Sequence, residues 1–400
     1  MKARWHLGGR VAGPALCALA LLALALPATA AAGDGAQASI INGRPATIAE
    51  FPSLAFVQAR EGKTGFSCTG TVVAPRVILT AAHCVEDLER GGFTPADGYA
   101  VATGTTDLGE ALPENVFRVV ETHVFPGFDL GNLRGDAGIL ILDRPSPAPP
   151  IPLAGAADAA FYAGGATVQL AGWGLTRANA KKGADALRTT PMVVQSASSC
   201  KQKTRRNYPS FSPTQQLCAL DFPAGKSGGC YGDSGGPAIG QRADGSQVQL
   251  GVISTGGPFC NTKLPNVLTR ADFISAWVAE WIAAIETGAA RPVIDPSASF
   301  PLMTRPVAEA FTIYTLQDAL GRRFERAKRV GGRCTRASRS RFRCEISWRV
   351  GPTIYAGVVS PFYVARPQGV TWDSNFRIEW AALGCLRSNA PRCPIHSKRG

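Results

Sequence analysis

Short apolar runs separated by glycine, proline and asparagine or aspartate turns fill two stretches of the chain, residues 51–145 and 166–270. Many short strands punctuated by turn residues are typical of antiparallel barrels and sandwiches. A proline-rich polar segment, residues 143–152, separates the two stretches and suits a crossing between them. The pattern therefore predicts an all-β core made of two six-stranded antiparallel barrels.

The hydrophobic period changes after these stretches. Apolar residues recur at helical spacing over residues 271–285, and again over residues 311–329, where the opposite face is basic. Residues 289–300, rich in alanine and proline, separate the two and are typical of a linker. We therefore expect a helix that closes the barrels and then a small α+β module over residues 301–400, with strands at residues 343–350, 353–364 and 376–382.

The first 30 residues have the pattern of an export signal. Lys2, Arg4 and Arg10 precede an apolar stretch, residues 11–26, and small residues follow it. A membrane anchor is the alternative, but the apolar run is short for a bilayer span and ends in a cleavage pattern. We expect residues 1–30 to be a signal peptide, with no membrane span after its removal, and the mature protein to be secreted and extracellular.

The positive charge is concentrated at the C-terminal end. The 400 residues carry a net charge of +13, of which +12 lies in residues 291–400, with 19 Lys and Arg against 7 Asp and Glu. Clustered arginines release counterions when they bind phosphate. The module is therefore either an adhesion domain for an anionic polymer, such as a cell-envelope polyanion or nucleic acid, or a small domain with a solvated basic face. Its arginines include Arg333, Arg336, Arg339, Arg341 and Arg343.

The segment at residues 229–237, Gly-Cys-Tyr-Gly-Asp-Ser-Gly-Gly-Pro, carries the strongest chemical signal. A serine hydroxyl is a weak nucleophile and needs an oriented base and a site for the developing oxyanion. Gly232 and Gly235 would let the backbone approach a substrate carbonyl, and the amides of Gly232 and Ser234 would form the oxyanion hole. An ordinary Asp-Ser-Gly surface turn is the alternative.

A base and an acid precede this serine along the chain. His83 follows a β-branched apolar run, and Asp136 comes just before another apolar run. A buried Asp would fix the imidazole tautomer and stabilise the imidazolium. The nucleophile elbow of α/β-hydrolases is a rival interpretation, but it needs a histidine after the serine, and only His396 follows Ser234.

Five motifs occur along the chain: Thr80-Ala81-Ala82-His83-Cys84, the strand after Asp136, Ala171-Gly172-Trp173-Gly174, residues 232–237 and residues 265–270. Together they resemble the trypsin/chymotrypsin-like serine proteases over about residues 40–288. The resemblance implies two Greek-key barrels with a C-terminal helix, and a serine endopeptidase that forms an acyl-enzyme, with His83 as base, Asp136 as its orienting acid and Ser234 as nucleophile. A non-catalytic binding protein on the same fold is the alternative, although such relatives usually have a damaged triad.

The resemblance also implies activation by cleavage. Residues 31–39 would be a short propeptide, and the freed ammonium of Ile40 would pair with Asp233. Two residues depart from the family pattern: Asn42 stands where glycine is usual, and Ser39 precedes the cut where Lys or Arg is usual. The activating enzyme is therefore expected not to be trypsin-like.

The cysteines indicate disulfides. One of the eleven, Cys17, lies in the signal, which leaves an even number in an exported chain. The spacings contain no Cys-x-x-Cys pair and histidine is scarce, so we expect neither a metal nor a cofactor. The resemblance implies Cys68–Cys84, Cys200–Cys218 and Cys230–Cys260, which leaves Cys334–Cys344 and Cys385–Cys393 as two further pairs.

Substrate selection in the resembled family depends on the pocket for the side chain before the scissile bond. Its floor would be Gly228, where an aspartate would bind Lys or Arg, and its walls would include Ser254, Gly256 and Asn266. Glycine at the floor predicts a preference for uncharged residues over Lys and Arg. We expect protein or peptide substrates and a monomeric enzyme.

Overall fold

The computed structural model describes residues 40–61, 64–86, 93–129, 133–180, 182–205, 211–292, 300, 302–366, 368–383 and 394–400. The expected signal and propeptide, residues 1–39, lie outside these ranges, as do residues 293–299 of the expected linker.

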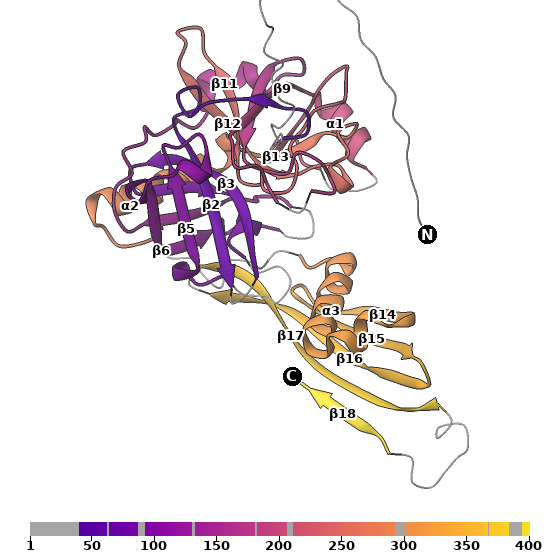
Figure 1. The fold of residues 1–400 in the computed structure, drawn as a ribbon. Coiled ribbons are helices and arrows are strands. Elements are labelled where there is room, and N and C mark those ends of the chain that lie inside the picture. Colours follow the sequence, from indigo (N-terminus) through magenta and orange to yellow (C-terminus); the bar gives the residue numbers. More distant parts are fainter. Residues whose placement is uncertain are drawn as a thin grey trace, which may run out of the picture. The chain divides into compact units, whose positions relative to one another are not determined.

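Six antiparallel strands close the first barrel in the order β2-β3-β4-β7-β6-β5 (Figure 1). Every residue of the apolar strands β4 and β7 is buried, which explains why they carry no polar alternation. The strands are β2 (Leu54–Glu61), β3 (Thr64–Ala74), β4 (Val77–Thr80), β5 (Tyr99–Thr103), β6 (Val116–Val124) and β7 (Gly138–Leu142).

The second barrel has the strand order β9-β10-β13-β12-β11-β8, and pairing between β8 and β9 closes it. A short strand, β1 (Arg44–Pro45), adds to β9, and helix α1 (Ala197–Thr204) precedes β10. The expected all-β core of two six-stranded antiparallel barrels is confirmed. Its strands are β8 (Thr167–Gly172), β9 (Arg188–Val194), β10 (Gln216–Leu220), β11 (Pro237–Gln241), β12 (Gln247–Thr255) and β13 (Asn266–Arg270).

Helix α2 (Ala271–Thr287) follows the second barrel and packs into the core of the first. Its buried stripe includes Ile274, Trp277 and Trp281, and His123 on β6 stacks on Trp281 at 3.6 Å between ring centres. The helix ends at Gly288 in the left-handed conformation, a common helix C-terminus. The two tryptophans are therefore core residues of the closing helix.

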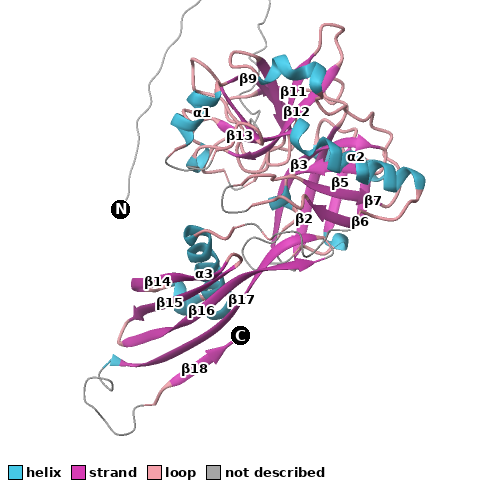
Figure 2. Ribbon diagram, turned by 180° about the vertical axis from the view of Figure 1, so that it is seen from behind, coloured by secondary structure: helices cyan, strands magenta, loops and turns pink. Residues whose placement is uncertain are grey.

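The C-terminal module is a five-stranded antiparallel sheet with helix α3 (Arg305–Leu320) on one face (Figure 2). Phe311 of the helix stacks on Trp372 of the sheet with ring centres 4.2 Å apart. A short helix, α4 (Arg322–Glu325), follows α3. The strands run β14-β15-β16-β17-β18, namely β14 (Lys328–Ser338), β15 (Arg341–Val350), β16 (Thr353–Arg366), β17 (Gly369–Ala382) and β18 (His396–Arg399).

The module differs from the sequence prediction at two places. The helix expected over residues 311–329 begins earlier and breaks at Gly321, whose φ is 48°. Strands β14 and β18 were not expected, because only Cys334 is buried in β14 and no residue is buried in β18. Without an apolar face, neither strand carries the alternation from which strands are predicted.

Disulfides join Cys68 to Cys84, Cys200 to Cys218, Cys230 to Cys260 and Cys334 to Cys344. The remaining expected pair, Cys385–Cys393, lies outside the described residues. Within the described ranges, no helix combines the length and the apolar character that a bilayer crossing requires.

Candidate active site

Ser234 lies in a turn that both barrels hold in place. The amide of Thr69, on β3 of the first barrel, donates to the carbonyl oxygen of Ser234 at 2.8 Å. The amide of Gly235 donates to the carbonyl oxygen of Ile253, on β12 of the second barrel, also at 2.8 Å. The serine is therefore fixed at the junction of the barrels.

The glycines of this turn are required by backbone geometry. Gly232 and Gly235 have φ values of 94° and 81°, which L-residues rarely adopt. A Cβ at Gly235 would lie 2.1 Å from Oγ1 of Thr80. Within the described part of the chain, the amides of Gly232 and Ser234 donate to no protein acceptor. Two such amides at the serine are suited to hold an oxyanion.

His83 lies on a short 3₁₀ turn, Ala82–Cys84, directly after the buried strand β4. Its Nδ1 lies 2.8 Å from Oδ2 of Asp136, and its backbone amide donates to Oδ1 at 3.0 Å. The side chain of His83 is 19% exposed and that of Asp136 is fully buried. Two bonds to one carboxylate fix both the position and the orientation of the imidazole.

Two residues of the second barrel complete the surroundings of Asp136. Ser254 donates from Oγ to Oδ2 of Asp136 at 2.5 Å, and Thr269 donates from Oγ1 to its carbonyl oxygen at 3.0 Å. Sequence reasoning placed Ser254 only as a wall of the specificity pocket and did not find Thr269. Neither role has a sequence signal, because both depend on how the barrels meet.

Asp136 makes His83 more basic. Burial opposes the imidazolium, but the charge of Asp136 and its hydrogen bond outweigh burial and raise the pKa of His83. An imidazole with a raised pKa accepts the proton of a serine hydroxyl more readily, so this site is suited to general-base chemistry.

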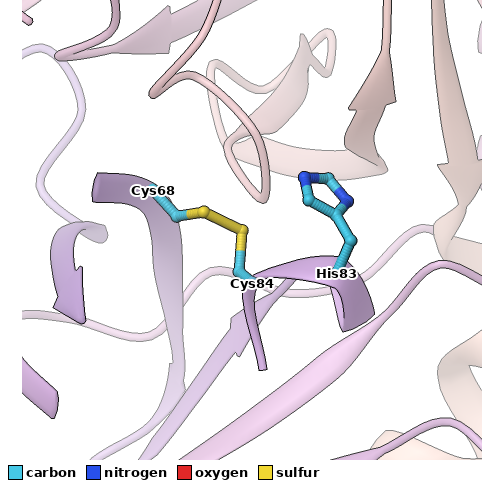
Figure 3. A group of neighbouring side chains, drawn as sticks. All are labelled: Cys68, His83 and Cys84. Carbon is cyan, nitrogen blue, oxygen red and sulfur yellow. A yellow bond between two sulfur atoms is a disulfide. The ribbon is translucent and has the colours of Figure 1, made fainter. Parts of the chain in front are cut away.

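The Cys68–Cys84 disulfide lies beside the His83 ring (Figure 3). The possible ligand atoms of these three residues lie within 4.8 Å of one another. Metal binding by cysteine requires thiolates, and the two sulfurs are joined to each other. The disulfide therefore ties the turn that carries His83 to strand β3.

A cavity of about 360 Å³ contains both His83 and Ser234 in its lining. Of the four expected specificity residues, Ser254, Gly256 and Asn266 line it, whereas Gly228 does not. The Asn266 side chain bonds to the backbone of Gly229, the residue after Gly228: Oδ1 accepts from the Gly229 amide at 3.1 Å, and Nδ2 donates to the Gly229 carbonyl at 3.4 Å. Asn266 and Gly229 both line the cavity beside Gly228, which stays a predicted floor residue.

Asp233 and Ile40, the expected activation pair, are both buried in the second barrel region. The carboxylate accepts from the amides of Cys230 at 2.9 Å and Gly174 at 2.8 Å. Burial raises the pKa of Asp233 to about 7, against the effect of these two bonds. Asp233 makes no ion pair with a described residue, so it is a buried acid suited to a cation.

The segment after Ile40 is held against the specificity region. The Ile41 amide donates to the Gly228 carbonyl at 2.9 Å, and Nδ2 of Asn42 donates to the Lys226 carbonyl at 2.8 Å. Asn42 has a φ of 53°, in the left-handed region that asparagine tolerates better than other non-glycine residues. This conformation explains why asparagine can stand where the resembled family usually has glycine.

Two closed barrels with serine, histidine and aspartate at their junction define the class of serine proteases. The trypsin family model matches residues 40–278. A trypsin-like protease of Streptomyces glaucescens is 28% identical over 66% of this chain and 90% of its own length. A trypsin of Saccharopolyspora erythraea is 31% identical over 58% of this chain and 92% of its own length. A chymotrypsin of Phaedon cochleariae is 28% identical over 61% of this chain and 83% of its own length.

The chain belongs to the trypsin family. It is a serine endopeptidase, as the sequence predicted, and its substrates are proteins or peptides.

Proposed function

We propose that the protein is a secreted endopeptidase whose catalytic triad is His83, Asp136 and Ser234. The observation that carries this proposal is the fully buried carboxylate of Asp136, which bonds to both the backbone amide and Nδ1 of His83. His83 in turn lines the same cavity as Ser234. An aspartate in this position selects the imidazole tautomer that can accept a proton from serine.

The reaction uses these groups in sequence. Ser234 Oγ attacks the peptide carbonyl while His83 takes its proton, and the amides of Gly232 and Ser234 donate to the oxyanion. His83 then gives the proton to the leaving amine, which departs and leaves an acyl-enzyme on Ser234. Water, deprotonated by His83, hydrolyses the ester and restores the serine.

We propose a preference for uncharged side chains before the scissile bond. The described residues that line the 360 Å³ cavity include no carboxylate. Both ends of the Asn266 amide are engaged by Gly229, so the floor offers a short, neutral surface. Without a counter-ion, a buried Lys or Arg side chain would lose hydration that nothing replaces.

We also propose that cleavage before Ile40 activates the enzyme, which then acts as a monomer. The pKa of Asp233, raised by burial, supports this, because a new ammonium at Ile40 would supply the missing cation. Pairing there would fix the adjacent Ser234 turn.

The test is peptide hydrolysis by a fusion cleaved to leave Ile40 as the first residue. The parent is expected to cleave protein substrates, and Ser234→Ala is expected to lose activity by about three or more orders of magnitude. Sedimentation of the cleaved parent checks the monomer. Equal activity of parent and Ser234→Ala would overturn the proposed nucleophile.

A second proposal concerns the C-terminal module, which we infer binds an anionic polymer. Strand pairing places a row of side chains on the face opposite α3, in which Arg333, Glu345, Val358 and Arg377 are cross-strand neighbours. Arginines outnumber carboxylates on this face, and a hollow of about 610 Å³ lies between Arg343 and Arg377. The arginines of this face are Arg333, Arg341, Arg343, Arg349, Arg377 and Arg399.

Retention of the full chain on phosphocellulose tests this second proposal. Ser234→Ala protein is expected to elute earlier, at lower salt, when Arg343 and Arg377 are changed to Gln, because fewer counterions are then released. Arg177→Gln and Lys201→Gln, on the protease domain, are the charge-matched control. Equal elution of the two double variants would leave the basic face as a solvated surface.

A further inference from the structure

The C-terminal module contacts the first barrel through the hairpin that β16 and β17 form. These strands pair as far as Arg366 with Gly369, and both they and the barrel belong to one unit, residues 37–400. At the end of the hairpin, the carbonyl of Gln368 accepts from the amide of Val124, the last residue of β6, at 2.7 Å. A Cβ at Gly369 would lie only 3.0 Å from Cβ of Val124. The glycine therefore lets the hairpin approach the barrel closely.

A buried hydrogen bond joins the hairpin to the barrel close to this contact. Thr371 of β17 donates from Oγ1 to Oε1 of Glu86 at 2.6 Å. Thr371 is 1% exposed and Glu86 is 3% exposed, so bulk water reaches neither side chain. A buried carboxylate that loses a donor is destabilised more than a surface one, because water does not replace the donor. The bond is therefore expected to fix the hairpin in one position on the barrel.

Glu86 belongs to the same turn as His83. The amide of Glu86 donates to the carbonyl of Ala82 at 2.9 Å, so the chain from Ala82 to Glu86 forms one hydrogen-bonded turn that contains His83. The disulfide described above ties the middle of this turn to β3. Thr371 ties the end of the turn to the module.

The hairpin also approaches the segment that precedes Asp136. Tyr363 of β16 is buried, and among the described residues its hydroxyl has no hydrogen-bond partner. Burial, and then the charges of Asp129 and Glu86, raise the pKa of Tyr363, so this hydroxyl lies near two carboxylates of the first barrel. Asp129 pairs with Arg134, two residues before Asp136, through backbone hydrogen bonds and an ion pair at 3.3 Å. The module therefore lies against the segments that carry both the base and its orienting acid.

We propose that Thr371 is a positioning residue for the catalytic histidine, which it holds in place through Glu86. The C-terminal module thereby takes part in shaping the active site of the protease domain. Neither Thr371 nor Glu86 lines the cavity that contains His83 and Ser234, so the effect is on the geometry of the base and not on substrate binding. Small displacements of a catalytic group lower the rate of the chemical step. This inference rests on the proposed triad.

Steady-state kinetics of the full chain, cleaved to leave Ile40 as its first residue, test this role on one peptide substrate. Thr371→Val keeps the shape of the side chain and removes the donor, so kcat should fall about tenfold while KM stays within about twofold of the parent value. Thr371→Ser keeps the hydroxyl and should restore kcat to near the parent value. The rate of labelling by a fluorophosphonate, which reports the reactivity of Ser234 without a peptide, should fall in parallel with kcat.

Thr312→Val is the matched control. Thr312 is likewise buried in the module, but its hydroxyl donates to the Ala308 carbonyl of its own helix at 2.7 Å. The kcat and KM of this variant should equal those of the parent. A double-mutant cycle with Glu86→Gln tests the route to His83, because the two changes together should reduce kcat by much less than the product of their single effects.

Four results would overturn the assignment. They are an unchanged kcat in Thr371→Val, an equal loss of kcat in Thr312→Val, a Thr371→Ser variant as slow as Thr371→Val, and fully multiplicative effects in the cycle. If Thr371→Val does not fold, Glu86→Gln alone tests the same bond, and a kcat equal to that of the parent would overturn the assignment too. Absence of both peptide hydrolysis and fluorophosphonate labelling in the folded parent would instead contradict the proposed function itself.

Discussion

The hydroxyl of Ser254 donates a 2.5 Å hydrogen bond to Oδ2 of Asp136, the same oxygen that faces Nδ1 of His83. Ser254 belongs to β12 of the second barrel, whereas Asp136 and His83 belong to the first. The bond therefore links the His83–Asp136 pair of the first barrel to the second barrel, and it helps to fix the carboxylate that orients the imidazole.

Replacing Ser254 by Ala should reduce kcat more than it changes KM. A hydrogen bond to a charged group contributes about 1.5 kcal/mol or more, so a loss of about tenfold in kcat is expected. Steady-state kinetics on a peptide substrate measure it. Ser198→Ala, on the exposed face of α1, is the matched control and should retain parent activity. An unchanged kcat for Ser254→Ala would show that its bond to Asp136 does not support catalysis.

Asp136 should determine the acid limb of the pH–activity profile. Its charge and hydrogen bond raise the pKa of His83 against the effect of burial, and only neutral His83 can act as a base. Activity of the parent should therefore fall as the pH drops through a value above 6.5. Asp136→Asn should move this limb to lower pH and reduce kcat by about three to four orders of magnitude. A pH profile of kcat/KM in both proteins checks the shift, and a limb at the same pH in both would contradict it.

Asp233 should make the uncut chain less stable as the pH rises. Burial raises its pKa from 3.8 to about 7, so the folded chain binds a proton that the unfolded chain has lost in this range. The contribution of protonated Asp233 to the free energy of unfolding is complete below about pH 4. It is lost as the pH rises from about 4 to about 7, by roughly 4 kcal/mol at most.

Thermal unfolding of uncut Ser234→Ala protein between pH 4 and pH 8 measures this dependence. Adding Asp233→Asn should flatten the curve, because the amide does not titrate. Cleavage before Ile40 should reverse its sign, since a carboxylate paired with an ammonium has a lowered pKa. Identical pH dependence with and without Asp233→Asn would refute the assignment.

Gly235→Ala should prevent formation of the active turn. Its Cβ would lie 2.1 Å from Oγ1 of Thr80 and 2.3 Å from the Thr69 carbonyl oxygen, and its φ of 81° is also unfavourable. Gly245 provides a close control, because its φ is 84° but nothing lies within 4 Å of a Cβ there. Gly245→Ala should lower the free energy of unfolding by about 1 kcal/mol and retain the parent's activity. Equal melting temperatures and activities in the two variants would contradict this account of the turn.

Asn266→Gly should deepen the specificity pocket. The Asn266 side chain lines the cavity, and a Cβ at Gly228 would lie 3.1 Å from its Oδ1. Removing it should raise kcat/KM for bulky uncharged residues relative to small ones by about tenfold. Peptides that vary only in the residue before the bond measure this change, and an unaltered ranking would place the floor elsewhere.

Much of the site could be predicted from the sequence, because its chemistry lies in contiguous motifs. His83 follows an apolar strand, Asp136 precedes one, and Ser234 lies among glycines whose positive φ values the structure explains. The barrels were likewise predictable from short apolar runs between turn residues. Strand β14 was not, since it exposes nearly every side chain and so carries no periodicity.

Contacts between distant residues lie beyond what the sequence reveals. The bond of Ser254 to Asp136 spans 118 residues, and the clamp of Asn266 on Gly229 spans 37. Nothing local in the sequence indicates which hydroxyl or amide will meet a buried partner. Similarly, a cavity beside Gly232 combines β2 and β3 with residues 173–185, which come together only when both barrels have formed.

Labelling of the Ile40-terminated protein with a fluorophosphonate, followed by peptide mass spectrometry to locate the modified residue, tests whether Ser234 is the activated nucleophile. We predict labelling of the parent at Ser234, and none in Ser234→Ala or in parent protein whose labelling is blocked by prior reaction with a serine-directed inhibitor. No labelling of folded, correctly cleaved parent, or labelling at another serine, would contradict the claim that Ser234 is the activated nucleophile.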